Sequence, residues 1–136
     1  MPKIFQLAVF LVSPLFVSFP ASSNIEPVSV AVKFGYFISS NAVLTLRWSP
    51  MPDYYIYNIK LWSQDDDLEL YERSIPAAEE VLVGGAPMNV FSGSDLEFEY
   101  LIGSIPQGSS LSVQYSSCHK EGYCYPPQRY ELNFEL

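Results

Sequence analysis

The sequence is poor in basic residues, and it has only one histidine. Its 136 residues include 7 Lys and Arg against 15 Asp and Glu, which gives a formal net charge of -8. Binding to nucleic acid or to an anionic membrane surface depends on clustered Lys and Arg, so the acidic excess argues against both. A Ser-His-Asp or Cys-His catalytic arrangement could be built only around His119. We interpret His119 as an exposed loop residue.

Recognisable sites for phosphate groups and metal ions are also missing. The sequence has no glycine-rich phosphate loop, and Asp65-Asp66-Asp67 lacks the glycine and the distant glutamate of an EF-hand loop. A zinc site would need Cys118, His119, Cys124 and a fourth ligand, but adjacent residues rarely bind one tetrahedral ion together. We therefore predict a surface loop over residues 64–69, and we expect neither a metal nor a bound cofactor.

Long apolar runs are absent except at the N-terminus. Lys3 is followed by a mostly apolar run from Ile4 to Phe19 and then by the small residues Ala21-Ser22-Ser23. This order is typical of a signal peptide, and the run is short of the ~20 apolar residues that a membrane span needs. An uncleaved membrane anchor is the alternative. We predict that residues 1–23 are a signal peptide, and that residues 24–136 form one exported domain without stable membrane insertion.

The chain is rich in aromatic and β-branched residues. Aromatic residues make up 15% of the sequence and charged residues 16%, which is typical of a compact β-rich domain. Alternating or continuously apolar segments predict strands over residues 28–38, 42–48, 54–62, 81–83, 96–100, 111–115 and 130–136. No window has a sustained helical period. Short strands at this spacing predict an all-β fold, an immunoglobulin-like antiparallel β-sandwich.

The only two cysteines, Cys118 and Cys124, lie at the two ends of a turn that contains Gly122. They could reach the ~5.5 Å Cα spacing of a disulfide. Such a short loop stabilises a fold by only about 2 kcal/mol, so a bond placed for stability alone would link more distant strands. Small exported domains nevertheless usually carry structural disulfides. The spacing by itself favours a structural bond and leaves an exchanging bond open.

The residues after the second cysteine favour an exchanging bond. Tyr123 and Tyr125 flank the sulfur with aromatic surface that can shield it or receive a partner. Pro126 and Pro127 restrict the backbone and lack amide hydrogens, so we expect regular strand pairing to stop just beyond Cys124. A disulfide at a fixed strand end can be reached by an attacking thiolate.

Three segments carry a pattern that one protein family shares. They are Cys118-x5-Cys124-Tyr125-Pro126-Pro127, Leu44-Thr45-Leu46-Arg47-Trp48 and Asp53-Tyr54-Tyr55-Ile56-Tyr57. They are similar to the Cys-x5-Cys-Tyr-Pro-Pro element, the Leu-Thr-x-x-Trp strand and the Tyr-Tyr-x-Tyr segment of one domain. The chain therefore resembles the N-terminal periplasmic domain of DsbD, the transmembrane thiol:disulfide interchange protein, over most of residues 24–136.

The resemblance implies an immunoglobulin-like sandwich that relays electrons between thioredoxin-like partners in the periplasm, as a component of a protein-disulfide reductase. It implies that Cys124 forms the mixed disulfides and that Cys118 is the resolving thiol. The side chains that would line the site are Tyr55, Tyr57, Tyr123, Tyr125 and Pro126.

In this family a cap loop lays an aromatic side chain over the disulfide. The matching stretch here is residues 88–93, with Val90 or Phe91 as the cover. The family's cap often carries acidic residues where this chain has Met88 and Asn89, which is a departure from the pattern. The family also continues into a membrane electron conduit and a thioredoxin-like domain beyond the position of the last residue here. We therefore expect either that a separate protein supplies the electrons or that this sequence is a fragment of a longer chain.

Three hypotheses for the function follow from these observations. The first is an exported thiol–disulfide exchange domain that acts through mixed disulfides without a cofactor. The second is an exported β-sandwich binding module in which the disulfide is only structural. The third is a metal-handling or copper-handling accessory protein, for which the available ligands are Met88, His119 and the two cysteines.

Overall fold

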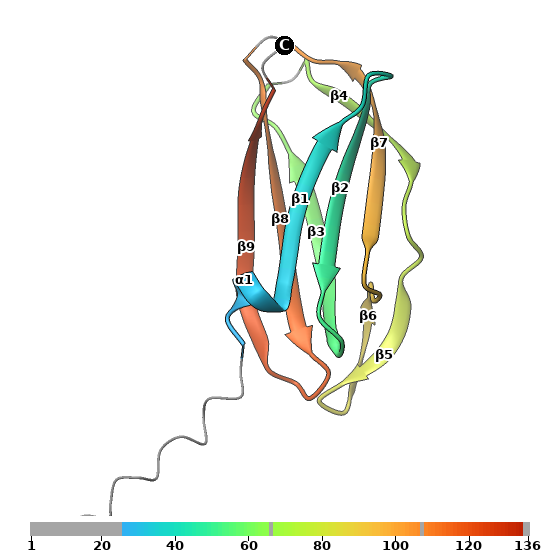
Figure 1. Cartoon of the computed structure of the whole chain (residues 1–136), viewed down its shortest axis with the longest axis vertical. Coiled ribbons are helices and arrows are strands. Elements are labelled where there is room, and N and C mark those ends of the chain that lie inside the picture. The colour runs from blue at the N-terminus through green and yellow to red at the C-terminus, as the bar shows by residue number, and fades with distance from the viewer. Residues whose placement is uncertain (1–25, 66, 107, 135–136) are drawn as a thin grey trace, which may run out of the picture.

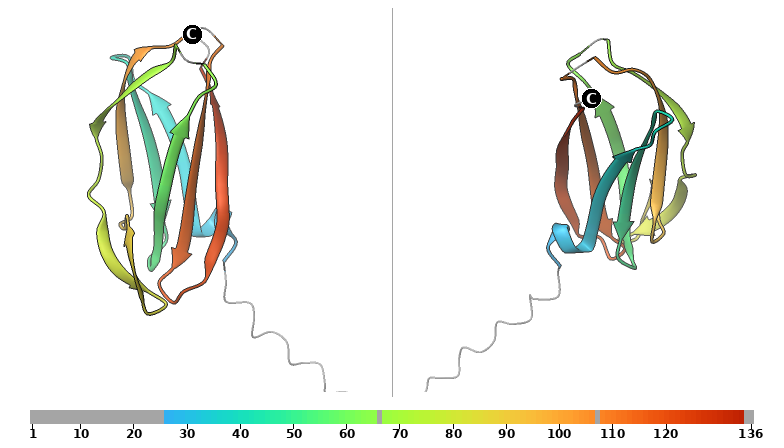
Figure 2. Two further views of the ribbon diagram at one scale, coloured as in Figure 1. Left: turned by 180° about the vertical axis from the view of Figure 1, so that it is seen from behind. Right: turned by 45° about the horizontal axis from the view of Figure 1, so that its top comes forward.

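The computed structural model describes residues 26–65, 67–106 and 108–134. Two antiparallel sheets face each other, and a two-stranded ribbon lies at one end of them (Figures 1 and 2). The elements are α1 Val28–Ala31, β1 Val32–Ile38, β2 Val43–Pro50, β3 Tyr54–Trp62, β4 Glu69–Ser74, β5 Glu79–Val83, β6 Ala86–Val90, β7 Leu96–Ser104, β8 Ser110–His119 and β9 Cys124–Asn133. This is the antiparallel all-β sandwich that the sequence predicted. The predicted signal peptide, residues 1–23, lies outside the described residues.

The order of the strands decides which of them have a free edge. One sheet has the order β1-β2-β7-β4, the other has the order β3-β8-β9, and the ribbon consists of β5 and β6. Strand β8 is therefore central in its sheet, with β3 on one side and β9 on the other, and β9 is at the edge. In the described part of the chain, no helix is long and apolar enough to cross a membrane.

The core is centred on Trp48 of β2. Its ring centroid lies 4.9 Å from that of Phe34, 5.1 Å from that of Phe98 and 5.6 Å from that of Tyr115, so it joins β1, β7 and β8. Trp48 is fully buried, as are Leu44 and Leu46 on the same strand. Because alternate residues of a strand share a face, the predicted alternation of residues 42–48 placed these side chains correctly.

The structure differs from the sequence prediction in three elements. Residues Val28–Ala31 form a single helical turn, in which the amides of Val30 and Ala31 both bond to the carbonyl of Pro27, and the strand begins only at Val32. Strand β4 was not predicted, because its side chains are nearly all exposed and its sequence therefore lacks an alternation of apolar and polar residues. Strand β6 was also not predicted, because it directly follows the turn at residues 84–85 and contains a proline.

The pairing of β8 with β9 corrects a further prediction. Regular pairing does not stop after Cys124 but continues as far as Asn133. Between the pairs Ser117↔Tyr125 and Tyr115↔Gln128, residues 126–127 of β9 stand opposite the single residue 116 of β8. The two prolines are thus accommodated in a β-bulge, where the ladder needs no amide hydrogen from them.

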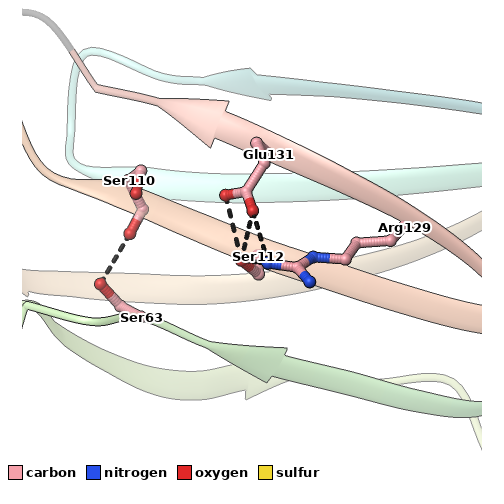
Figure 3. A network of polar contacts seen from close by, with 5 residues as sticks. All are labelled: Ser63, Ser110, Ser112, Arg129 and Glu131. Atoms are coloured by element: carbon pink, nitrogen blue, oxygen red, sulfur yellow. Dashed lines mark hydrogen bonds and ion pairs between the residues drawn. The ribbon is translucent and has the colours of Figure 1, made fainter.

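A polar network joins the strands of the β3-β8-β9 sheet at the end away from Cys118 and Cys124 (Figure 3). The Ser63 hydroxyl donates to the carbonyl oxygen of Ser110 at 2.6 Å, which joins β3 to β8. The Ser112 hydroxyl donates to the carboxylate of Glu131 at 2.9 Å, and Arg129 donates to the same carboxylate at 2.8 Å. The hydrogen bond from Ser112, followed by that from Arg129, lowers the pKa of Glu131 below the usual value of a glutamate.

Candidate functional site

The two cysteines form a disulfide at the turn end of the β8–β9 hairpin. Cys118 of β8 and Cys124 of β9 are directly opposite in register, with their Cα atoms 4.0 Å apart. Directly opposite residues of an antiparallel pair point to the same face of a sheet, so the backbone brings the two sulfurs together. Cys118 has no exposed surface, whereas Cys124 is exposed. The two residues of this bond therefore differ in their exposure to solvent.

A five-residue segment, His119 to Tyr123, connects the cysteines, and we call it the cysteine turn. Its first and last residues are joined by a hydrogen bond from the amide of His119 to the carbonyl of Tyr123, at 2.9 Å. The amide of Gly122 bonds to the carbonyl of His119, also at 2.9 Å. Gly122 has a φ of +112°, a conformation that side chains other than glycine rarely adopt. The turn thus holds Cys124 in place relative to Cys118.

Strand β3 brings two of the predicted tyrosines to the buried sulfur. Tyr55 is directly opposite Cys118 in the ladder, and Tyr57, two residues further on, points to the same face. The Tyr57 hydroxyl donates to the sulfur of Cys118 at 3.6 Å. A donor at this position stabilises negative charge on Cys118 when the disulfide opens.

Aromatic rings surround the cysteine turn on its other side. The His119 ring stacks on Tyr123, with centroids 4.6 Å apart, and meets the edge of Tyr54 at 4.9 Å. The Tyr54 ring is also stacked on that of Tyr125, at 6.2 Å. Desolvation, followed by hydrogen bonding to Tyr54, raises the pKa of both Tyr123 and Tyr125 above the usual value of a phenol. These hydroxyls therefore stay protonated and do not act as bases, and that of Tyr125 donates to the carbonyl oxygen of Glu26. The remaining predicted lining residue, Pro126, is exposed in the bulge.

The segment that was expected to cap the disulfide is an extension of the β3 edge. Phe91 exchanges two backbone hydrogen bonds with Ile56, at 2.8 and 3.1 Å. Its ring packs edge-on against Phe98 in the core, with centroids 5.0 Å apart. Val90, the last residue of β6, is fully buried. That Val90 or Phe91 covers the disulfide stays a prediction.

The tip of the β5–β6 hairpin braces the cysteine turn, a contact that the sequence did not predict. The amide of Gly84 donates to the carbonyl of Lys120 at 2.9 Å. The two backbones approach so closely that a Cβ atom added to Gly84 would lie 2.9 Å from the Cα of Gly122. On the other side of the turn, the amide of Lys120 bonds to the carbonyl of Asp53 at 2.9 Å. The positive φ of Gly84, +58°, is the only local feature that marks this contact, and nothing in the sequence shows its partner.

Comparison with known proteins identifies this arrangement. A family model described as "Thiol:disulfide interchange protein DsbD, N-terminal" matches residues 22–135. The chain belongs to the DsbD N-terminal family. Among curated relatives, the Thiol:disulfide interchange protein DsbD of Photorhabdus laumondii is 29% identical over 140 residues, which cover 93% of this chain and 23% of that protein. That of Vibrio vulnificus is 31% identical over 121 residues, covering 82% of this chain and 19% of that protein. The chain thus spans about a fifth of the length of these relatives.

A solved structure shows the same fold. The DsbD N-terminal domain of Neisseria meningitidis, crystallised in the reduced form, superimposes with a TM-score of 0.67 at 18% identity, over 85% of this chain and 93% of that one. The immunoglobulin-like fold expected from the resemblance is therefore confirmed. Membership of the DsbD N-terminal family, together with the disulfide formed by the two cysteines, identifies a thiol:disulfide interchange domain and disfavours the hypothesis of a binding module with a structural bond.

The metal-handling hypothesis finds no support in the geometry. Within residues 26–65, 67–106 and 108–134, no group of three or more His, Cys, Asp and Glu side chains is placed to hold a metal ion. In particular, the imidazole of His119 is turned toward its own loop, where Nδ1 accepts a hydrogen bond from the amide of Glu121 at 3.1 Å.

Proposed function

We propose that this DsbD N-terminal domain exchanges electrons with thioredoxin-like partners in the periplasm, and that Cys124 is the cysteine that forms the mixed disulfide with them. The observation that carries the proposal is the difference between the two sulfurs of one bond. Cys124 is exposed, whereas Cys118 has no exposed surface. Because exchange requires in-line access to the attacked sulfur, only Cys124 can be the point of attack in the oxidised domain.

The first step reduces the domain by one bond exchange. A thiolate of a dithiol partner attacks the sulfur of Cys124, a new disulfide forms between the two proteins, and Cys118 leaves as a thiolate that takes up a proton. The Tyr57 hydroxyl, 3.6 Å from the sulfur of Cys118, stabilises the leaving thiolate by its hydrogen bond. The second thiol of the partner then attacks the partner sulfur that is joined to Cys124. The partner closes its own disulfide, and Cys124 is released. Two electrons and two protons have moved, the partner is oxidised, and the domain is a dithiol.

The reduced domain passes the electrons on by the reverse chemistry. The Cys124 thiolate attacks the disulfide of an oxidised partner, and Cys118 resolves the mixed disulfide and closes the original bond. The carbonyl oxygen of Gly122 lies 3.8 Å from the sulfur of Cys124 and can accept a weak hydrogen bond from its thiol.

The setting of this chemistry is part of the proposal. Residues 1–23, as a cleaved signal peptide, would deliver the domain to the periplasm, where disulfides persist. The electrons would reach the thioredoxin-like partner from a separate membrane electron conduit, as the family resemblance implies.

Trapping experiments with single-cysteine variants test the assignment. With Cys118→Ala, the free Cys124 should accumulate a mixed disulfide with a thioredoxin-like domain, detected by non-reducing electrophoresis and mass spectrometry. With Cys124→Ala, the buried Cys118 should trap at most a few per cent as much. If Cys124→Ala traps the partner and Cys118→Ala does not, the roles are reversed. A reduction potential of the Cys118–Cys124 pair below about -300 mV would mark an inert structural bond and would exclude the exchange function altogether.

A further inference from the structure

We infer that His119 is a positioning residue of the cysteine turn. Its neutral imidazole stabilises the turn conformation that places Cys124 opposite Cys118. Protonation of the imidazole removes this stabilisation, so the disulfide becomes easier to reduce as the pH falls. The inference rests on the proposed exchange function, because it concerns the same disulfide. It goes further in making the exchange equilibrium respond to pH through a residue that is not one of the reacting groups.

The amide groups of the cysteine turn show what His119 contributes. Three of the four amides from residue 119 to residue 122 bond to backbone carbonyls, and the fourth bonds to a side chain. The donor and acceptor pairs are His119 to Tyr123, Lys120 to Asp53 and Gly122 to His119, each at 2.9 Å, and Glu121 to Nδ1 of His119 at 3.1 Å. The His119 side chain therefore satisfies the one amide of this turn that the backbone does not.

This hydrogen bond exists only for the neutral ring. To accept from the Glu121 amide, Nδ1 must carry a lone pair, so the ring proton is on Nε2. In the imidazolium form both ring nitrogens are donors, and an N–H on Nδ1 would face the N–H of Glu121. The ring itself stays in place, because the face of Tyr123, 4.6 Å away, attracts a cation as well as a neutral ring. Protonation thus removes the hydrogen bond and leaves the packing.

The other titratable groups around His119 do not account for such a response. The rings that pack on it are Tyr54 of β3 and Tyr123 of the turn, and Tyr125 of β9 lies behind Tyr54. The pKa values of Tyr123 and Tyr125 are raised, so these phenols stay neutral. The neighbouring charges within the turn are the carboxylate of Glu121 and the ammonium of Lys120, the latter paired at 3.5 Å with the Asp53 carboxylate. Histidine is the residue type whose charge ordinarily changes between pH 5 and pH 8.

Losing this hydrogen bond affects the disulfide because the turn is the loop that the disulfide closes. An ordered turn presents the thiol of Cys124 to that of Cys118 at the right distance, and a looser turn lowers their effective concentration for each other. One net hydrogen bond corresponds to about a fivefold change in an equilibrium constant. We therefore expect the equilibrium between disulfide and dithiol to shift toward the dithiol by about fivefold when His119 is protonated.

Two substitutions separate the hydrogen bond from the charge. In His119→Asn, the side-chain oxygen can accept the amide two residues on, as Asn does in Asx turns, but it does not titrate. In His119→Ala, no acceptor remains. The equilibrium constant of each oxidised protein with dithiothreitol is measured between pH 5 and pH 8. At pH 8 the wild type should match His119→Asn, while His119→Ala is about fivefold easier to reduce. At pH 5 the wild type should have moved to the value of His119→Ala, and His119→Asn should not.

A constant ratio between wild type and His119→Asn across this range would overturn the inference, as would equal values for the Asn and Ala variants. A second readout does not depend on redox activity. In the oxidised wild type, the Glu121 amide signal in a nitrogen-15 NMR titration should shift together with the His119 ring signals, and in His119→Asn it should not shift. If the amide follows the ring but the protein traps no thioredoxin-like partner, the proposed function fails and the positioning role stands. If the amide does not respond, the positioning role fails, whatever the exchange activity.

Discussion

The contact between the two hairpins can be tested with two neighbouring glycines. Gly84 and Gly85 form the tip of the β5–β6 hairpin, with φ values of +58° and +88°, as the favoured two-residue hairpin turn requires. An alanine in such a conformation costs roughly 1–2 kcal/mol at either position. Only at Gly84, however, does the added Cβ meet another backbone, 2.9 Å from the Cα of Gly122 and 3.3 Å from the carbonyl oxygen of Glu121. At Gly85 the Cβ meets nothing within 4 Å.

Both Gly84→Ala and Gly85→Ala should therefore destabilise the fold through the strain of an alanine at a positive φ. Gly84→Ala should in addition push the hairpin away from the cysteine turn. This movement breaks the 2.9 Å hydrogen bond from the Gly84 amide to the Lys120 carbonyl, which is worth about 0.5–1.5 kcal/mol. We expect the free energy of unfolding to fall by about 1 kcal/mol more in Gly84→Ala than in Gly85→Ala, as measured by urea denaturation of the oxidised proteins.

The same pair of variants should differ in reactivity. Because the braced turn carries Cys124, loosening it should raise the rate of reaction with glutathione by about fivefold in Gly84→Ala, the kinetic equivalent of one hydrogen bond. Gly85→Ala should react at the wild-type rate. Equal losses of stability and equal rates in the two variants would refute the idea that the hairpin tip braces the site, because strain at a positive φ is common to both.

Three further outcomes follow from the structure. Tyr57→Phe removes the donor to the sulfur of Cys118, so stopped-flow reduction by a small thiol should slow by about two- to tenfold at constant pH, and an unchanged rate would remove Tyr57 from the mechanism. Leu46→Ala empties a fully buried site on β2 and should lower the free energy of unfolding by about 2–5 kcal/mol in urea while the folded protein reacts with glutathione at the wild-type rate. The pKa of Glu131 is lowered by folding, so its stabilising effect is complete above its usual value of 4.5 and is lost as the pH falls through the lower folded value. The urea midpoint of Glu131→Gln should accordingly fall less between pH 5 and pH 3 than that of the wild type, and a parallel fall would show that the network with Ser112 contributes nothing.

Much of the fold could be predicted because burial leaves a period in the sequence. The alternation of residues 42–48 and the aromatic run of residues 54–62 predicted the bounds of β2 and β3 to within two residues. Strand β4 left no such period, because five of its six side chains are exposed, and a strand that buries nothing looks like a loop. The bulge at residues 126–127 was missed for a different reason. Proline correctly signalled a break in the ladder, but whether a break ends a strand or only adds a residue depends on the partner strand.

The candidate site divides in the same way between local and long-range features. The pairing of Cys118 with Cys124 could be predicted, because a short turn brings the two ends of a hairpin together whatever the rest of the fold does. The contact of Gly84 with Gly122 could not, since it joins segments 38 positions apart that no shared pattern connects. Likewise, the sequence predicted His119 to be an exposed loop residue, and this was wrong, because His119 is the last residue of β8 and is half-buried. Its hydrogen bond within the turn depends on the geometry of the ring.

The order of strands in the second sheet explains why one disulfide has two different sulfurs. Cys118 is on β8, which has β3 on one side and β9 on the other, so its sulfur is enclosed from both sides and is fully buried. Cys124 begins β9, which is the edge of the sheet and has a neighbour on one side only. A bond with a purely structural purpose gains nothing from this difference, because its contribution to stability comes from closing a loop and is the same whichever sulfur is exposed. A bond that must open at one sulfur and be resolved by the other does gain from it, since a central strand protects the resolving cysteine while an edge strand presents the attacked one. Under the proposed exchange mechanism, the strand order therefore favours attack at Cys124 before any cap segment or partner contributes to it.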